Sequence, residues 1–192
     1  MTCIIGLKKD QHIYIGGDSC GSDQFSYRDC YLDRKVWKIG DQFIFGGSGS
    51  YRAIQILKTY LPYDKSFLSK SKNWKKSPST FMIRHFIPTI KKLFEQHDFS
   101  QKKDEKSEQS ANLCIGFKNG LFLFGDEYDI LEIKSFCTIG SGYQLSQGAM
   151  SVLIEDKNLT PQQMIKKALT VTARHMGSVT PPFHIVNMKN VK

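Results

Sequence analysis

The sequence predicts an α+β fold, a four-layer αββα sandwich in which two stacked antiparallel sheets are covered by helices on both sides. Two observations carry this prediction. Pairs of expected strands alternate along the chain with pairs of expected helices, an order typical of sheets and helices in separate layers. The expected strands are apolar on both faces, which indicates burial between a sheet and a helix layer. A chain of 192 residues suits a single domain, 1–192.

The first half of the chain reads as two hairpins followed by two helices. Apolar runs at 2–7 and 12–17 predict the first hairpin, and runs at 35–39 and 42–45 predict the second. The polar stretch 19–33 between them reads as a loop, and the glycine-rich stretch 46–50 reads as a loop that leads into a helix over 51–60. A second helix should start at Ser77-Pro78, with a kink at Pro88.

The second half repeats this order with different spacing. Residues 100–110 are charged and poor in apolar side chains, so a mobile loop is expected there. Runs at 113–117 and 121–124 flank Asn119-Gly120 and predict a hairpin, and runs at 130–133 and 136–139 suggest another pair. Helices are expected over 142–155 and 161–175, the second opened by a capping box at Thr160, and 183–188 should form the last strand.

Composition indicates a cytoplasmic protein without a disulfide framework. No apolar run approaches the length of a membrane span, and charged residues interrupt the N-terminal apolar run too early for a signal peptide. The five cysteines lack metal-ligand spacing. We interpret Cys3, Cys114 and Cys137 as small core residues, whereas Cys20 and Cys30 flank a polar loop and their role is open.

Most of the net charge of +9 lies between residues 58 and 92. This basic segment could bind nucleic acid, an acidic partner surface or an acidic peptide, or it could be a solvated helix face and loop. No nucleic-acid motif accompanies the charge, so we favour the solvated face and expect no nucleic-acid ligand.

The start of the chain carries the residues that suggest chemistry. Removal of Met1 would leave Thr2 with both a hydroxyl and a free amine at the head of an apolar strand. A threonine hydroxyl is a weak nucleophile unless a base lies beside it, and an N-terminal amine is such a base. The small side chain of Thr2 favours removal of Met1. One residue could therefore supply both nucleophile and base.

The order and spacing of several motifs resemble one family over nearly the whole chain. These motifs are Thr2 heading a strand, Gly16-Gly17-Asp18, Arg34-Lys35-Val36, the 46–50 loop, and Ile139-Gly140-Ser141-Gly142. The chain resembles the N-terminal-nucleophile (Ntn) hydrolases of the proteasome β-subunit type, and most of all the HslV-type bacterial peptidase subunit. The resemblance implies the Ntn-hydrolase fold.

The resemblance also implies roles for five residues. Thr2 would be the nucleophile, Asp18 would orient the amine and anchor a cation, and Lys35 would be that cation. Gly49 matches the glycine whose N–H faces the oxyanion, and Ser141 matches the serine near the threonine amine. Without the resemblance, Asp18 reads as a hairpin-end carboxylate, Gly49 as a turn glycine and Ser141 as a helix N-cap.

One offset departs from the family pattern. The family lysine falls sixteen residues after its aspartate, which lands on Arg34, whereas Lys35 falls seventeen after Asp18. Arginine and lysine differ in geometry and in hydration, so the two positions are not interchangeable. An extra residue in the 19–33 loop restores Lys35-Val36, and we therefore favour Lys35.

The resemblance predicts a threonine-type endopeptidase that assembles into a homo-oligomeric ring and receives protein substrates from an AAA+ ATPase unfoldase. The chemistry needs no cofactor or metal, although backbone carbonyls in the turn at 176–182 bind a structural monovalent cation in some relatives. Two alternatives stay open. One is a catalytically inactive ring or scaffold subunit, favoured by the shifted lysine and by Met1. The other is an Ntn amidase that acts on a small amide.

Overall fold

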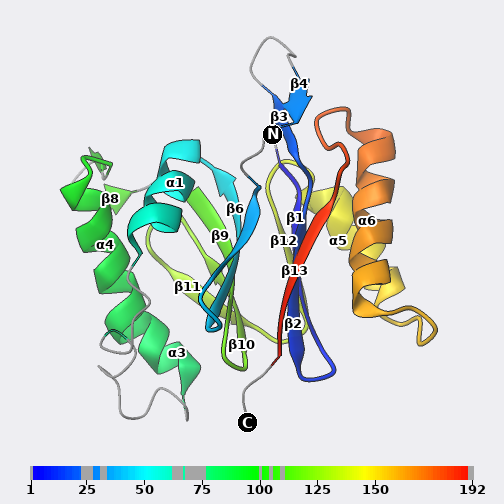
Figure 1. The fold of residues 1–192 in the computed structure, drawn as a ribbon, viewed down its shortest axis with the longest axis horizontal. Helices are drawn as coiled ribbons and strands as arrows, with labels where there is room; N and C mark the ends of the chain where they lie inside the picture. Colours follow the sequence, from blue (N-terminus) through cyan, green and yellow to red (C-terminus); the bar gives the residue numbers. More distant parts are fainter. Residues whose placement is uncertain are drawn as a thin grey trace.

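A computed structural model of the chain describes residues 2–22, 28–30, 34–61, 67, 77–99, 101–103, 106–108 and 111–189. Two antiparallel sheets lie face to face at its centre (Figure 1). The four-stranded sheet has the order β12-β1-β2-β13 and consists of β1 (Ile4–Lys9), β2 (His12–Gly17), β12 (Phe136–Ile139) and β13 (His184–Lys189). The five-stranded sheet has the order β11-β10-β9-β6-β5 and consists of β5 (Val36–Ile39), β6 (Phe43–Gly49), β9 (Ala111–Phe117), β10 (Gly120–Phe124) and β11 (Ile130–Ile133).

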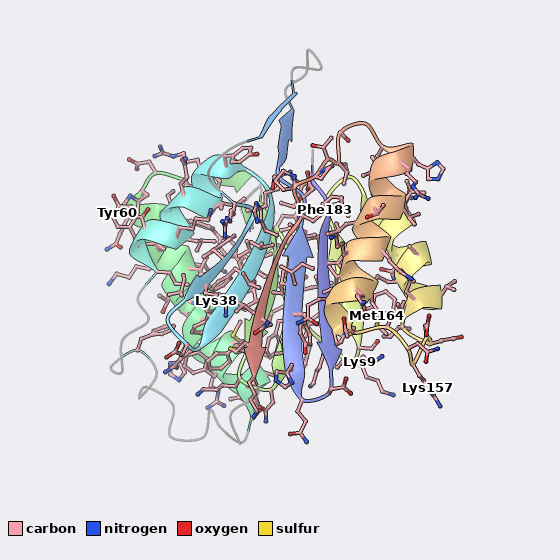
Figure 2. All side chains as sticks on the ribbon, turned by 45° about the vertical axis from the view of Figure 1, so that its right-hand side comes forward. Lys9, Lys38, Tyr60, Lys157, Met164 and Phe183 are labelled. Atoms are coloured by element: carbon pink, nitrogen blue, oxygen red, sulfur yellow. The ribbon has the colours of Figure 1, made fainter. Side chains whose placement is uncertain are left out.

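Helices cover the outer face of each sheet (Figure 1). The five-stranded sheet is covered by α1 (Tyr51–Tyr60), α3 (Pro78–Phe81), the π-helical turn η1 (Met82–Phe86) and α4 (Ile87–Gln96). The four-stranded sheet is covered by α5 (Tyr143–Leu153) and α6 (Pro161–His175). Lys9 reaches from the end of β1 to α6, where its Nζ lies 3.7 Å from the Met164 sulfur (Figure 2). The predicted four-layer αββα sandwich is thus confirmed.

Most expected elements lie where the sequence places them. The hairpins β1–β2, β5–β6 and β9–β10 form as predicted. The capping box of α6 is also present: the Thr160 hydroxyl accepts from the Gln163 N–H, and the Gln163 side chain accepts from the Thr160 N–H. Cys3, Cys114 and Cys137 are buried free thiols, as expected. Among the described residues, no helix combines the length and apolar character needed to cross a membrane.

The expected pairing of 130–133 with 136–139 is wrong. Strand β11 pairs with β10 in the five-stranded sheet, whereas β12 pairs with β1 in the other sheet. A tight hairpin needs residues with positive φ in its turn, and neither Lys134 nor Ser135 has one. The connection instead carries the chain from one sheet to the other, and the Lys8 N–H donates to the Ser135 carbonyl at 2.7 Å.

Three expected loops contain strand. Residues 46–49 continue β6 and pair with β9, so the glycine-rich stretch is mostly strand. Within 19–33, β3 (Cys20–Ser22) pairs with β4 (Arg28–Cys30), which brings Cys20 and Cys30 opposite each other in register. Within 100–110, β7 (Gln101–Lys103) pairs with β8 (Lys106–Glu108). Low apolar content does not exclude a hairpin, because the ladder is formed by backbone groups. Mobility of this segment stays a prediction.

Near Pro88, where the sequence predicts a kink, the helix changes from a π-helical turn to an α-helix. Proline lacks an N–H and its ring clashes with the carbonyl four residues earlier, here that of Arg84. The π-helical turn η1 precedes the proline and ends just before α4. The Thr89 hydroxyl donates to the His85 carbonyl at 2.7 Å. Widening the helix one turn before the proline accommodates the ring without ending the helix.

Glycines allow the two sheets to pack closely against each other. A Cβ on Gly46 of β6 would lie 2.4 Å from Ile4 Cγ2 and 2.8 Å from Ile15 Cγ2 in the facing sheet. A Cβ on Gly6 of β1 would lie 2.3 Å from the Cys114 sulfur. Real Cβ atoms do not approach other atoms so closely, so these positions must lack a side chain for the sheets to pack.

Gly46→Ala should therefore lower the free energy of unfolding by about 1–3 kcal/mol, the usual cost of overpacking a core. Gly148→Ala is the matched control, because a Cβ on this helical glycine would meet nothing within 4 Å. Alanine there should raise stability by up to about 1 kcal/mol through helix propensity. Urea unfolding of both variants measures the difference, and equal effects would contradict this account of sheet packing.

Candidate active site

Thr2 lies just before β1, at the point where the chain enters the four-stranded sheet. Its N–H donates to the Ser141 Oγ at 3.1 Å. Its carbonyl accepts from the Gly142 N–H at 3.1 Å and from the Ser141 hydroxyl at 3.3 Å. The pairing of β1 with β12, in register Ile4↔Ile139, brings this turn against Thr2. The structure therefore joins the predicted residues Thr2 and Ser141 directly.

Gly140 allows this contact. Its φ is +88°, and a Cβ on it would lie 2.3 Å from the Thr2 carbonyl oxygen. Only glycine meets both conditions without strain. Sequence reasoning placed Gly140 in a motif but gave it no role of its own. The Gly-Ser-Gly pattern before an expected helix was the signal that could have found it.

Asp18 and Lys35 form a buried ion pair. Lys35 Nζ lies 2.9 Å and 3.1 Å from the two carboxylate oxygens of Asp18. The residues are only 1% and 3% exposed. Asp18 follows β2 in one sheet and Lys35 precedes β5 in the other, so the pair also links the sheets. Removing two charges from water is costly, and such a pair is stable only when its geometry and further hydrogen bonds satisfy both groups.

The Asp18 carboxylate also reaches the residue that follows Thr2. Its Oδ1 accepts from the Cys3 N–H at 2.8 Å, and the Asp18 N–H donates to the Cys3 carbonyl at 3.3 Å. Asp18 therefore fixes the backbone beside Thr2 and the Lys35 cation at once. Burial raises the pKa of the Cys3 thiol to about 11. This thiol is protonated at neutral pH and so is a poor nucleophile beside Thr2.

Arg34, the other residue considered for the site cation, has different surroundings from Lys35. The Arg34 side chain is exposed, and the Arg34 carbonyl accepts from Lys58 Nζ at 2.6 Å. Desolvation lowers the pKa of His184 at the start of β13, and the charge of Arg34 lowers it further. Arg34 is thus electrostatically coupled to β13, whereas Lys35 meets Asp18.

Gly49 ends β6 with a φ of +95° and is exposed. Two residues earlier, the Gly47 N–H donates to the Lys35 carbonyl at 2.9 Å, which holds this end of β6 beside Lys35. The next residue, Ser50, caps α1 by accepting from the Ala53 N–H. Gly49 therefore lies at the Lys35 end of the sandwich, and its contribution to an oxyanion site stays a prediction.

Ser19 is a site neighbour that sequence reasoning missed. It is buried directly after Asp18, its N–H donates to the Thr180 carbonyl at 3.3 Å, and its hydroxyl donates to the Pro182 carbonyl. Ser19 thereby ties the 176–182 turn to the residue that holds Lys35. A lone serine after an aspartate carries no signal in the sequence for this role.

The described residues contain no group of three or more His, Cys, Asp or Glu side chains that could hold a metal ion. Backbone carbonyls in the 176–182 turn are the oxygen ligands that a monovalent cation would use. Two of them, from Thr180 and Pro182, already accept hydrogen bonds from Ser19. The cation expected from the resemblance stays a prediction.

Comparison with solved structures bears out the resemblance at the level of the fold. Thiobacillus denitrificans BPH in complex with Epoxomicin matches with a TM-score of 0.78 and 17% identity, over 100% of both chains. Eukaryotic HslV from Trypanosoma brucei matches with a TM-score of 0.71 and 15% identity, over 98% of this chain and 100% of that chain. The Anbu (Gly-1) mutant from Hyphomicrobium sp. strain MC1 matches with a TM-score of 0.68 and 14% identity, over 98% and 82%.

The sequence itself matches no protein-family model and no curated protein. The chain thus shares the αββα sandwich of proteasome-type Ntn hydrolases. Sequence identities of 14–17% support a likeness of the fold alone.

Asp18→Asn should lower the free energy of unfolding by about 3–5 kcal/mol, because it removes the carboxylate charge that faces the buried Lys35 cation. Asp41→Asn is the control, since Asp41 is exposed and should change stability by less than about 0.5 kcal/mol. The double variant Asp18→Asn/Lys35→Met removes the buried cation as well and should recover part of the loss. Urea unfolding measures all three, and a small effect of Asp18→Asn alone would show that the pair contributes little.

Proposed function

We propose that the chain is the threonine-type endopeptidase subunit of a self-compartmentalised, HslV-like protease, with Thr2 as its nucleophile. One observation carries the proposal. The buried Asp18 carboxylate contacts both Lys35 Nζ and the backbone N–H of the residue after Thr2, while Ser141 Oγ accepts from the Thr2 nitrogen. The likeness to proteasome-type Ntn hydrolases supports a hydrolase of this kind.

The proposed base is the Thr2 nitrogen. Hydrolysis of the Met1–Thr2 bond turns this nitrogen from an amide into an amine, which has a reference pKa of about 7.7–8.0. The Lys35 cation, held by the carboxylate that also binds the Cys3 N–H, would disfavour a second positive charge on this amine and so favour its neutral, proton-accepting form. Ser141, already within 3.1 Å, would then orient the amine toward the Thr2 hydroxyl. Because threonine is β-branched, its hydroxyl has few rotamers and is held ready to attack.

The proposed reaction proceeds through an acyl-enzyme. The Thr2 oxygen bonds to the substrate carbonyl carbon while its proton passes to the amine, and the Gly49 N–H stabilises the oxyanion. The tetrahedral intermediate then expels the leaving amine, which takes the proton. Water attacks the resulting ester with the Thr2 amine again as the base, and the acyl product leaves. Each step uses groups that the chain itself supplies.

The proposed setting is a homo-oligomeric ring in the cytoplasm that encloses the active sites and receives unfolded chains from an AAA+ ATPase. A nucleophile of this kind would act on any accessible peptide bond, and enclosure in a ring would restrict the substrates that reach it. A ring count by negative-stain imaging tests the assembly separately from the chemistry.

Thr2→Ala should abolish hydrolysis of a fluorogenic peptide, a loss of about 10³-fold or more, because it removes the attacking oxygen. Thr2→Ser keeps a hydroxyl and should retain part of the activity. Epoxomicin, the ligand bound to the Thiobacillus protein, should bind the native enzyme and raise its melting temperature, with no such rise for Thr2→Ala. Unchanged melting temperatures of the unliganded variants provide the folding control.

The outcomes separate the alternatives. Full activity in Thr2→Ala would overturn the nucleophile assignment. A folded, ring-forming protein with neither peptidase activity nor epoxomicin binding would favour the inactive scaffold subunit. Hydrolysis of small amides by a monomer, with no cleavage of peptides, would favour the amidase.

The native protein should lack Met1. With Met1 attached, the Thr2 nitrogen is an amide and cannot accept the proton of the hydroxyl. Intact-mass measurement of the protein from its own host should give the sequence mass less one methionine residue. A fully active enzyme that retains Met1 would contradict the proposed base.

A further inference from the structure

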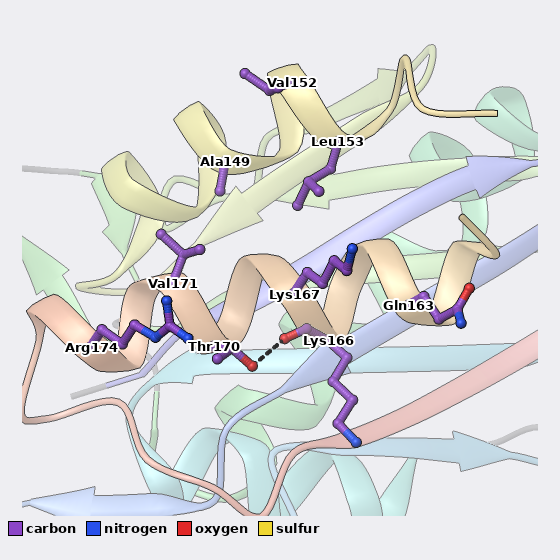
Figure 3. Close-up of a pocket in the computed structure, with 9 residues that line it drawn as sticks. All are labelled: Ala149, Val152, Leu153, Gln163, Lys166, Lys167, Thr170, Val171 and Arg174. Atoms are coloured by element: carbon purple, nitrogen blue, oxygen red, sulfur yellow. Dashed lines mark hydrogen bonds between the residues drawn. The ribbon is translucent and has the colours of Figure 1, made fainter. Parts of the chain in front are cut away.

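A hollow of about 620 Å³ lies between α5 and α6, the two helices that cover the four-stranded sheet (Figure 3). We call it the α5–α6 groove. Apolar residues from both helices line it: Ala149, Val152 and Leu153 from α5, and Val171 from α6. In Figure 3, Ala149 and Leu153 point toward α6 and Val171 points toward α5. Val152 points away from α6, so Ala149, Leu153 and Val171 form the apolar interior and Val152 lies at its outer edge.

Two apolar residues of the groove are exposed. Val152 is 73% exposed, the highest value among the large exposed apolar residues that the structure describes, and Val171 is 36% exposed. A Cβ on the neighbouring Gly148 would meet nothing within 4 Å, so this side of α5 is uncovered. Exposed apolar side chains beside charged ones offer contacts to an amphipathic partner.

The rim of the groove is cationic. Lys166, Lys167 and Arg174 of α6 line it, all three are exposed, and neither helix contains an aspartate or glutamate. Within the part of the chain that the structure describes, no ion pair neutralises any of the three. The groove thus combines an apolar interior with uncompensated positive charge.

The spacing of these charges is regular. Lys167, Val171 and Arg174 stand at positions i, i+4 and i+7 of α6, which places them on one side of the helix. The two cations are then about 10 Å apart along the axis. A partner helix with acidic side chains seven residues apart and apolar side chains between them matches this row.

We propose that the α5–α6 groove binds an acidic amphipathic helix of a partner protein. Its apolar side chains would bury Val152 and Val171, and its carboxylates would pair with Lys167 and Arg174. This is the helix-in-groove mode of recognition, with charge complementarity setting the orientation. The proposal does not rest on the peptidase activity proposed above.

Two other occupants fit less well. In a symmetric contact between two copies, the same basic surface meets itself, which brings like charges together without acidic residues on either helix to offset them. An anionic lipid surface is flat and would leave the concave apolar lining unfilled. Both occupants give distinct results in the tests below.

The probe is a fluorescein-labelled synthetic helix that repeats glutamate at i and i+7 with leucine at i+3 and i+4, and its binding is followed by fluorescence anisotropy. Binding should be saturable and should weaken as salt rises, because screening reduces charge pairing. A peptide with lysine in place of glutamate and one with serine in place of leucine should each bind at least tenfold more weakly. Absence of saturable binding would overturn the proposal.

The protein variants locate the site. Lys167→Glu/Arg174→Glu should weaken binding of the acidic peptide tenfold or more, and Val152→Ser should weaken it severalfold. Lys38→Glu/Lys92→Glu makes the same change in net charge at exposed positions on β5 and α4, and should change affinity by less than twofold. Equal weakening by both double variants would overturn the proposal, because it would indicate non-specific attraction. Melting temperatures establish that each variant is folded.

Two further measurements exclude the other occupants. Native mass measurement of Val152→Asp should give the oligomeric state of the wild-type protein, whereas loss of an oligomer would assign the groove to a second copy and overturn the proposal. Flotation with phosphatidylglycerol vesicles should not retain the wild-type protein. Retention that is lost in Lys167→Glu/Arg174→Glu would assign the groove to a lipid surface and likewise overturn it.

Discussion

The buried ion pair between Asp18 and Lys35 is the constraint on which the rest of the site depends. Neither charge could remain in this interior alone, so each fixes the other, and with them the ends of β2 and β5 in two different sheets. The same carboxylate accepts from the Cys3 N–H, which passes the constraint to the backbone beside Thr2. A single carboxylate thereby links the two sheets at this end to the backbone beside Thr2.

This pair can form only because the sheets lie close together, and glycines make that possible. Gly46 lies against Ile4 and Ile15 of the facing sheet, one strand position from the contact in which the Gly47 N–H donates to the Lys35 carbonyl. A side chain at Gly46 would push β6 outward and take β5 with it. The packing of the sandwich and the geometry of the site therefore both depend on the distance between the two sheets.

Sequence patterns determine most of the layers but not the contacts between distant segments. Hairpins with short turns and helices with strong caps depend on neighbouring residues, so the pattern finds them. Which sheet β12 joins depends on packing that no local pattern contains, and the pairing of β11 with β12 was accordingly predicted wrongly. Lys35 pairs with Asp18, as the sequence reading expected of the site cation, and its part in catalysis stays a prediction. Gly140 and Ser19 act through contacts with Thr2 and the 176–182 turn that only the folded chain reveals.

Helix α5 connects the two regions to which we assign a function. Its first turn follows Ser141 and Gly142, which hold the Thr2 carbonyl, and its last turn supplies Val152 and Leu153 to the α5–α6 groove. The inner side of the helix packs through Met150 on the four-stranded sheet, so its position is fixed there. The free outer side then presents apolar groups that folding alone does not require to be exposed. Helix α5 therefore begins beside the residues proposed for catalysis and ends at the surface proposed for recognition, so the two proposed functions lie at opposite ends of one helix.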